Sequence, residues 1–362
     1  MFSHDLRLVL SPEDQYWFQG GWQSYQGEST LYNEAFSPSE VAHGKHIWGG
    51  LMLPDSLPLL GNGMGDCLCM RFQGDGSVLE LVEWHHEGSD WTHCGYSIQE
   101  ALSANRVNFD ASAVYSAPLS PVVVAETNCK RALQSRLHEV CAATGGRNLS
   151  RLAGVEWALF RTWLFDPSLI PEDKLKALSE SLEIKAGELI SQNWTLAAEQ
   201  AESVLKLRDD LAWPYAVVGW ANERNGRISA AKDAYRAGLM KLGSSSSFTS
   251  NWTRINSLLE GKFAAERLTA LADSGLDSQA REYLDALKNR AVRRYWTGQA
   301  QRATERREYS RAYQDLYAAG WDQVYFNDIG EVLSLLTDAA AKAGFNTLAE
   351  LASLHRRSLQ AG

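Results

Sequence analysis

A change in composition near residues 110–128 most constrains how this chain can fold. The residues before it are rich in Trp, Gly and turn formers, whereas those after Asn128 carry Ala, Leu, Arg and Glu at helical spacing. A chain of 362 residues is also too long for one ordinary hydrophobic core. We therefore predict an α+β N-terminal domain at residues 1–115, a connector at 116–130 and an all-α domain at 131–362.

The N-terminal domain is expected to contain a β-hairpin. Cys67–Phe72 and Val78–Trp84 are dense in β-forming residues, and the segment QGDG at 73–76 between them is a hairpin signal. A third extended segment is expected at Trp91–Tyr96. A short helix should follow, because Ser97–Glu100 has the pattern of a capping box.

Three alternating glycines, Gly61, Gly63 and Gly65, stand ahead of this hairpin in the stretch LLGNGMGDCLCMRF. A glycine loop that binds phosphate lies between a strand and a helix, because the helix N-terminus supplies partial positive charge. Here a strand follows instead, and the carboxylate of Asp66 would repel phosphate. The glycines are therefore predicted to be turn residues with positive φ.

The C-terminal half shows a weak period of 34 residues. Ala197, Ala231 and Ala265 share one register of this period. The period and the spacing of small residues resemble those of tetratricopeptide repeats, which are stacked helical hairpins. The resemblance covers residues 193–275 and departs from the repeat pattern where Gly238 replaces the usual Ala. It implies an array of helices whose surface binds a peptide.

Charge is distributed unevenly along the chain. The whole formal net charge of −9 lies in residues 1–150, because acidic and basic side chains cancel in residues 151–362. Such an acidic surface repels nucleic acid and anionic lipid and attracts basic proteins, although it also simply aids solubility.

Two further features of the sequence indicate a protein of the cytoplasm. The opening MFSHDLRLVL is not a secretory signal, and no later stretch is apolar for long enough to span a membrane. The five cysteines include no C-x-x-C pair, which favours reduced thiols over a disulfide framework. We expect no nucleic-acid partner and no membrane partner.

Acidic residues gather on and around the predicted hairpin, interleaved with two tryptophans. Acidic and exposed aromatic side chains together are typical of a surface that binds a basic protein. The alternative is that both tryptophans are core residues and the acidic residues form a solvated rim. The predicted partner-binding residues are Asp66, Asp75, Glu80, Glu83, Trp84, Glu87, Asp90 and Trp91.

Cysteines and histidines also gather between Cys67 and Cys94, but we predict no metal site. Structural zinc sites favour C-x₂₋₄-C knuckles, which a C-x-C on an extended strand does not form. The segment EWHHEGSDW at 83–91 holds His, Ser and Asp side chains, so a metal-dependent or His-assisted hydrolase that uses His85–Asp90 is the alternative function. No nucleophile elbow accompanies them, and we expect no catalytic residue and no cofactor.

Seven arginines form a basic patch in the helical half. We expect them to pair on helix surfaces or to dock onto the acidic N-terminal domain. Nucleic-acid binding is the alternative, which the total charge opposes. The seven are Arg290, Arg293, Arg294, Arg302, Arg306, Arg307 and Arg311.

A set of sequence features runs from Leu53 to Leu102. It comprises Leu53-Pro54, Asn62-Gly63 with Gly65-Asp66, the strand Cys67–Phe72, Gly76, Trp84 with His86-Glu87, and the helix Ser97–Leu102. These features resemble the SUKH superfamily of fungal cell-wall-assembly regulators and bacterial toxin-immunity proteins. Family members usually have a helix before the Leu-Pro, which three glycines interrupt here. The resemblance implies an α+β fold with a small twisted sheet and flanking helices, no catalysis, and binding of a protein, in bacteria a toxin.

Overall fold

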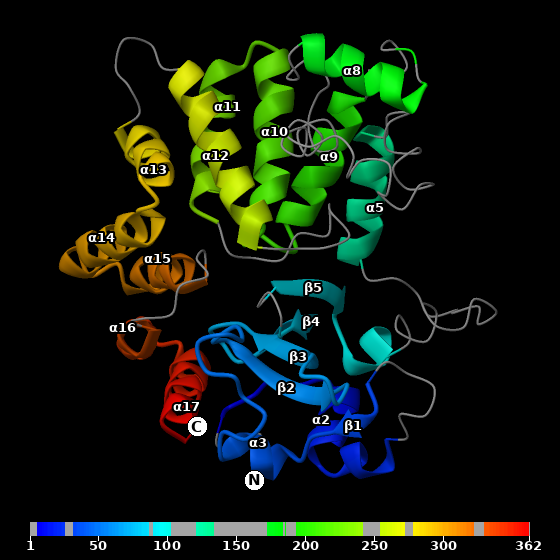
Figure 1. Ribbon diagram of the computed structural model, residues 1–362, viewed down its shortest axis with the longest axis vertical. Helices are drawn as coiled ribbons and strands as arrows, with labels where there is room; N and C mark the ends of the chain where they lie inside the picture. The colour runs from blue at the N-terminus through cyan, green and yellow to red at the C-terminus, as the bar shows by residue number, and fades with distance from the viewer. Residues whose placement is uncertain are drawn as a thin grey trace. The chain divides into compact units, whose positions relative to one another are not determined.

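The computed structural model divides the chain into two compact units (Figure 1). The sheet unit comprises Met1–Pro118, Ser245–Ser257 and Glu282–Gly362, and the helical unit comprises Leu119–Ser244 and Leu258–Arg281. An α+β N-terminal region and an all-α C-terminal region are present, as predicted. The structure describes residues 6–25, 32–86, 90–102, 121–133, 172–183, 185, 193–241, 254–271, 278–321 and 329–361.

A five-stranded antiparallel sheet forms the centre of the sheet unit, and its strands follow one another in chain order. The predicted hairpin is confirmed, with the third predicted extended segment beside it as the last strand. The strands are β1 (Glu34–Ala35), β2 (Ser56–Gly61), β3 (Cys67–Phe72), β4 (Val78–His85) and β5 (Asp90–Gly95).

The turn between β3 and β4 is fixed by its own side chains. Asp75 Oδ1 accepts hydrogen bonds from the backbone amide of Ser77 at 2.9 Å and from its hydroxyl at 2.6 Å. Gly76 has φ +87°, and a Cβ there would lie 2.4 Å from the carbonyl oxygen of Arg7. Only glycine therefore fits this position without strain.

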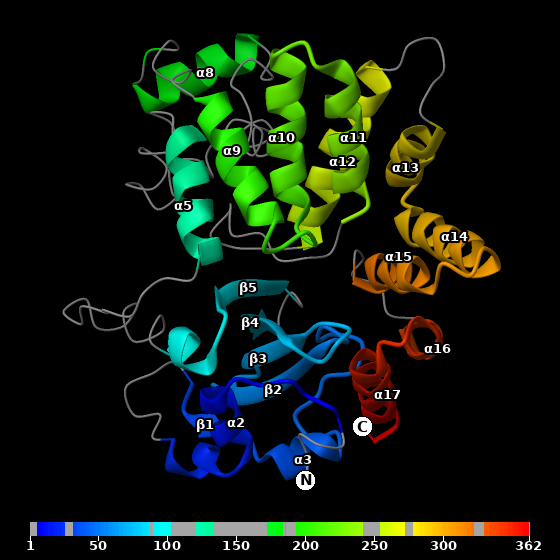
Figure 2. The same cartoon turned by 180° about the vertical axis from the view of Figure 1, so that it is seen from behind.

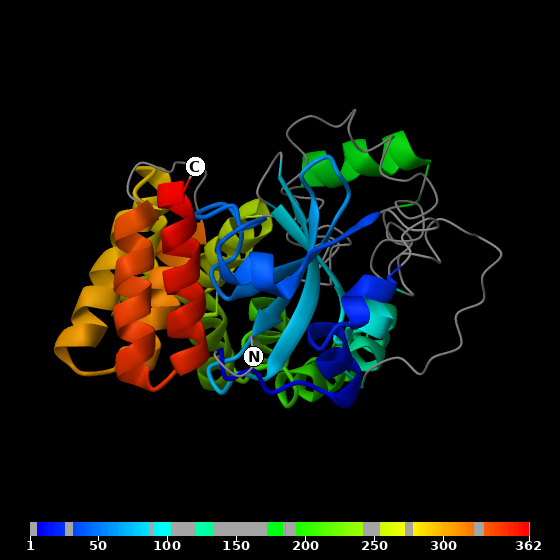
Figure 3. The same cartoon turned by 90° about the horizontal axis from the view of Figure 1, so that it is seen from below.

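Helix α2 (Pro12–Phe18) and the helix at residues 98–102 lie on one side of the sheet (Figure 3). The predicted capping box starts the second helix, since Ser97 Oγ accepts from the amide of Glu100 at 3.1 Å. Buried Asp14 of α2 accepts a hydrogen bond from the amide of Ile98 at 3.1 Å, which ties the two helices together. The short elements η1 (Gly21–Ser24) and α3 (Pro38–Ala42) lie between α2 and β2 along the chain.

The C-terminal helices cover the other side of the same sheet (Figure 3). Thr347 Oγ1 donates to the carbonyl of Leu6 at 3.0 Å, and His355 Nε2 donates to the carbonyl of Ser56 at 2.9 Å. These helices and the strands share one cluster of buried apolar side chains. The helices are α14 (Val292–Glu305), α15 (Tyr309–Trp321), α16 (Ile329–Ala343) and α17 (Asn346–Ala361).

The structure divides the chain differently from the predicted boundaries, because the predicted all-α domain at 131–362 contributes its last helices to the sheet unit. The physical reason lies in the sheet. All six residues of β3 are buried, so both of its faces need cover. Helical periodicity in a sequence indicates that a helix has an apolar face, but it does not indicate what that face packs against.

In the helical unit, helices pack against their neighbours along the chain, and the helix at Pro121–Leu133 also packs against the helix at Trp194–Leu205 (Figure 2). Ala197, Ala231 and Ala265, the predicted repeat positions, are all 0% exposed. None of the described helices combines the length and the apolar character that a membrane span requires. The helices are α5 (Pro121–Leu133), α8 (Glu172–Leu182), α9 (Trp194–Leu205), α10 (Ala212–Arg224) and α11 (Ile228–Leu239), while α12 (Arg254–Ala270) and α13 (Ser278–Lys288) each cross a boundary between the units.

Candidate partner-binding site

Three of the predicted partner-binding residues lie in the core instead of on a surface. Trp84 is 1% exposed, Trp91 is 0% exposed and Glu80 is 1% exposed. Trp84 of β4 lies between Cys67 of β3 and Trp91 of β5, on neighbouring strands of a sheet that is covered on both sides. The alternative stated for the two tryptophans, that they are core residues, is the one that the structure supports.

Glu80 belongs to a buried ionic cluster. The guanidinium of Arg71 contacts the carboxylates of Glu80 and Asp55, and it lies 3.1 Å from the hydroxyl of Tyr317 on α15. His93 Nδ1 lies 2.8 Å from the other oxygen of Glu80. Burial disfavours the charged guanidinium, but these anions hold the pKa of Arg71 well above its usual value. The cluster joins the sheet to α15 and is closed to a partner.

The remaining predicted residues do not form one face. Asp66 directly precedes β3, whereas Asp75 lies in the turn after it, at the opposite end of that strand. Glu83 is half-buried on β4. Asp90 begins β5, but its side chain lies outside the described part of the structure, as does the whole of Glu87.

The glycine turn between β2 and β3 is organised by the side chain of Asn62. Its Oδ1 accepts from the amides of Met64 at 2.9 Å and Asp66 at 3.1 Å, and its Nδ2 donates to the Asp66 carboxylate at 2.9 Å. Gly63 has φ +71° and Gly65 has φ +109°, which confirms that both are turn residues with positive φ.

Gly61 differs from the other two glycines, because it ends β2 and does not have positive φ. A Cβ at Gly61 would lie 2.5 Å from the ring of Phe36. Glycine is therefore required here by the close approach of an aromatic ring.

Asp66 connects the glycine turn to the end of β4. Its Oδ1 accepts a hydrogen bond from the amide of His86 at 3.0 Å and lies 2.9 Å from His86 Nδ1. Partial burial opposes ionisation, but the hydrogen bonds from His86 and Asn62 outweigh it and lower the pKa of Asp66. Asp66 is therefore a fixed negative charge at the beginning of the central strand, β3.

A surface hollow of about 180 Å³ lies beside this charge. Glu34, His46 and Trp48 line it together with the glycine turn. Trp48 is 45% exposed and stands 5.9 Å from the buried ring of Trp84, while Met64 at the tip of the turn is 69% exposed. We call Glu34, His46, Trp48, Met64 and Asp66 the glycine-turn surface.

Trp48 is the functional candidate that the sequence analysis missed. Its loop is pressed against the C-terminal helices, since a Cβ at Gly49 would lie 2.4 Å from the carbonyl oxygen of His355. Gly50 has φ +79°, and a Cβ there would lie 2.8 Å from Ile329. The sequence does contain a signal for this loop. Gly44 precedes the tryptophan by four residues and Gly49 and Gly50 follow it directly, and glycines disfavour a helix.

The Cys67 thiol at the start of β3 is held in its protonated form. Burial raises the pKa of the Cys67 thiol to about 12, so it stays protonated and is a poor nucleophile and metal ligand. Within the described residues, no group of three His, Cys, Asp or Glu side chains could hold a metal ion. His86 contacts Asp66, and no recorded hydrogen bond in the described part of the chain joins a Ser, Thr or Cys side chain to it.

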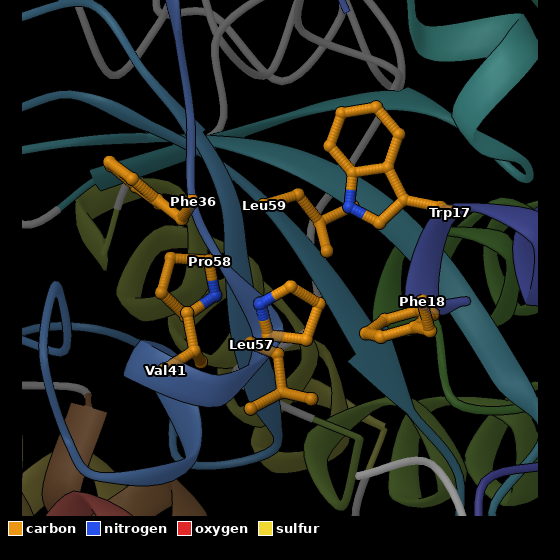
Figure 4. A pocket seen from close by; sticks show the side chains of 8 residues that line it. Trp17, Phe18, Phe36, Val41, Leu57, Pro58 and Leu59 are labelled. Carbon is orange, nitrogen blue, oxygen red and sulfur yellow. The ribbon is translucent and has the colours of Figure 1, made fainter. Parts of the chain in front are cut away.

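A second hollow of the sheet unit is a closed crevice. Apolar side chains of α2, α3 and β2 surround it, and they approach so closely that its cavity volume is about 0 Å³ (Figure 4). It is therefore part of the packed core and offers no room for a ligand. The side chains that Figure 4 labels there are Trp17, Phe18, Phe36, Val41, Leu57, Pro58 and Leu59.

Comparisons of the chain with models of known protein families, with curated proteins and with solved structures return no match. The resemblances to the SUKH superfamily and to tetratricopeptide repeats therefore stay predictions from the sequence.

Proposed function

We propose that this protein is a non-enzymatic binding protein whose glycine-turn surface engages a basic protein partner. The observation that carries the proposal is the exposed ring of Trp48 beside the fixed carboxylate of Asp66. Acidic groups around an anchoring aromatic side chain favour a partner that brings Lys or Arg.

The local structure supports this role in two ways. The hydrogen bonds of Asn62 and His86 hold the Asp66 carboxylate in place before any partner arrives, which lowers the ordering cost of binding. Trp48 packs on the buried Trp84 with 45% of its surface still exposed, so its ring is a rigid anchor.

A capture experiment with the full chain tests the proposal. Immobilised protein is incubated with lysate of the source cells, and the bound proteins are quantified by mass spectrometry. We expect one or a few basic proteins, with capture reduced about tenfold or more by Trp48→Ala, because a central aromatic anchor contributes about 2 kcal/mol. Glu34→Lys should reduce it further, since it reverses a charge that lines the hollow.

Glu350→Lys is the matched control. Glu350 is an exposed glutamate of α17 that lies outside the glycine-turn surface, so the same charge reversal should leave capture unchanged. Equal capture by all the variants would contradict the proposal, as would a captured set without basic proteins.

The resemblance to the SUKH superfamily adds a finer proposal, that the partner is a toxin which this protein neutralises. Co-expression with toxin-like genes from the same neighbourhood should then rescue growth, and Trp48→Ala should abolish the rescue. A regulatory adaptor role predicts a captured partner without toxicity.

The alternative function, a His-assisted or metal-dependent hydrolase, draws on the contact between His86 and Asp66. Elemental analysis of the purified protein distinguishes the hydrolase from the non-enzymatic binding protein. Stoichiometric zinc that is lost in His86→Ala would favour the hydrolase, whereas a protein without bound metal that still captures its partner would favour binding.

A further inference from the structure

Six of the seven arginines of the basic patch fall into two groups in the structure, and Arg293 is the seventh. In the first, Arg302, Arg306 and Arg311 form ion pairs with Glu282, Glu308 and Asp315. In the second, Arg290, Arg294 and Arg307 have no ion pair with any residue that the structure describes. Pairing on helix surfaces, one of the two predicted roles, is therefore observed for the first group and not for the second.

Arg290 and Arg294 line a groove of about 590 Å³ in the sheet unit, and Arg293 lines it with them. Its other wall comes from the beginning of α16, where Val332 and Leu335 contribute apolar surface. Leu335 is 40% exposed, although it lies on an otherwise well-packed helix. The groove thus combines cationic and apolar walls, and we call it the arginine groove.

The beginning of α14 adds to the positive character of the arginine groove. The first turn of this helix lines the groove, and its N-cap residue, Ala291, has no side chain that can accept a hydrogen bond from the first amides. Uncapped helix N-termini favour anions, and three arginines surround this one. Among the described residues of the lining, Glu331 is the acidic one, so positive charge dominates there.

Size and lining decide which anion fits. A groove of about 590 Å³ is much larger than a phosphate ion and falls within the range of sites that bury a peptide segment or a drug-sized molecule. Single-stranded nucleic acid would need aromatic side chains for base stacking, and the described residues of the lining include none. The two walls suit a peptide segment whose carboxylates face the arginines and whose aliphatic side chain faces Val332 and Leu335.

We propose that the arginine groove binds an acidic peptide segment of a partner protein, with carboxylates on Arg290 and Arg294 and an apolar side chain between Val332 and Leu335. The groove is a second interaction surface, opposite in charge to the glycine-turn surface, and it selects a different partner segment.

Panning of a random 12-residue phage-displayed peptide library on the full chain tests this proposal. The enriched peptides should combine Asp or Glu with Leu, Ile or Phe, and a synthetic fluorescent copy of one should bind in solution. The double variant Arg290→Ala/Arg294→Ala should weaken that binding about tenfold or more, as should 0.5 M salt. Leu335→Ser should weaken it several-fold at unchanged salt dependence, since it removes apolar contact only.

Arg307→Ala is the matched control for Arg290→Ala. Both arginines are exposed, both have positive φ (+62° and +53°) and neither has an ion pair in the described part of the chain, but Arg307 lies outside the groove. The control should change the peptide affinity less than twofold.

Three outcomes would overturn the proposal. They are failure to enrich acidic peptides, equal loss of affinity in Arg307→Ala, and tighter binding of a 15-nucleotide single strand than of any selected peptide. Circular dichroism of each variant shows that it is folded, so a loss of binding reports on the groove. Trp48→Ala should leave the peptide affinity unchanged, which separates this proposal from that for the glycine-turn surface.

Discussion

The sheet unit and the helical unit each bury an arginine, but they pair it in opposite ways. Arg71 is paired with Asp55 and Glu80 and contacts Tyr317, which follows it by 246 residues in the chain. In the helical unit, Arg208 Nε lies 2.7 Å from the carboxylate of Asp210, two residues away. Arg71 thus joins distant segments, whereas the Arg208–Asp210 pair joins two residues of one loop.

This difference reflects how the two units are assembled. The sheet unit needs chain segments from both ends of the protein, since its C-terminal helices and its strands share one core. The helical unit packs α9, α10 and α11 in chain order, and α5 against α9, so much of it is held by contacts between helices that are neighbours along the chain. We expect the sheet unit to lose its structure as a whole when a long-range contact is removed, and the helical unit to tolerate local damage.

The largest expected effect is that of Arg71→Met. Without the guanidinium, Asp55 and Glu80 remain buried with uncompensated charge, which costs about 3–5 kcal/mol of the free energy of unfolding. Arg208→Met should cost only about 1 kcal/mol, because its partner Asp210 is 34% exposed and water can solvate it. Urea denaturation gives both values.

Hydrogen exchange with mass spectrometry locates the effect of each variant. In Arg71→Met, peptides of the strands and of α15–α17 should lose protection together, while peptides of α9–α11 keep theirs. Loss of protection in the strands alone would contradict a single cooperative sheet unit.

Asp315 of α15 supplies the second test, through pH. Burial raises the pKa of Asp315 to about 6, and the hydrogen bond from Arg311 only partly opposes this. A carboxylate whose folded pKa lies above its unfolded value destabilises the folded state once it ionises, so stability falls as pH rises from about 4 to about 6 and is flat above. The expected loss is about 2–3 kcal/mol.

Asp315→Asn should remove this part of the pH dependence and keep an oxygen that accepts from Arg311. The difference in free energy of unfolding between the variant and the natural chain should therefore grow in favour of the variant from pH 4 to pH 6. Parallel pH profiles for the two proteins would contradict the raised pKa of Asp315.

Local structure was predictable from the sequence, because its causes are local. Positive φ at Gly63 and Gly65, the hairpin around Asp75 and the capping box at Ser97 all depend on neighbouring residues. The repeat positions of the buried alanines in the helical unit were predictable for the same reason, since their period of 34 residues recurs along the chain. The cover of the sheet by α15–α17 was not predictable, because no sequence pattern records which distant helix completes a core.

The candidate site was predictable in kind but not in its residues. An acidic and aromatic surface was expected near the hairpin, and Asp66 is part of one. Residue type alone does not distinguish an exposed tryptophan on a strand from a buried one, so Trp84 and Trp91 were predicted to be surface residues. Trp48 lies in a loop, and the glycines near it were its sequence signal. Glu80 was misplaced because its partner Arg71 lies on the same inward face, where a buried charge is stable only as a pair.

The smallest expected effects come from two helical glycines, one in each unit. At Gly219 of α10, a Cβ would lie 2.5 Å from the ring of Tyr235, so Gly219→Ala should force α10 and α11 apart and destabilise the helical unit by about 1–2 kcal/mol. Gly298 of α14 has no atom within 4 Å of such a Cβ, so Gly298→Ala should stabilise its helix by about 0.5–1 kcal/mol. If urea denaturation gives the two substitutions the same sign, the close approach of α10 and α11 is not what requires glycine at 219, and the local packing of the helical unit differs from that described.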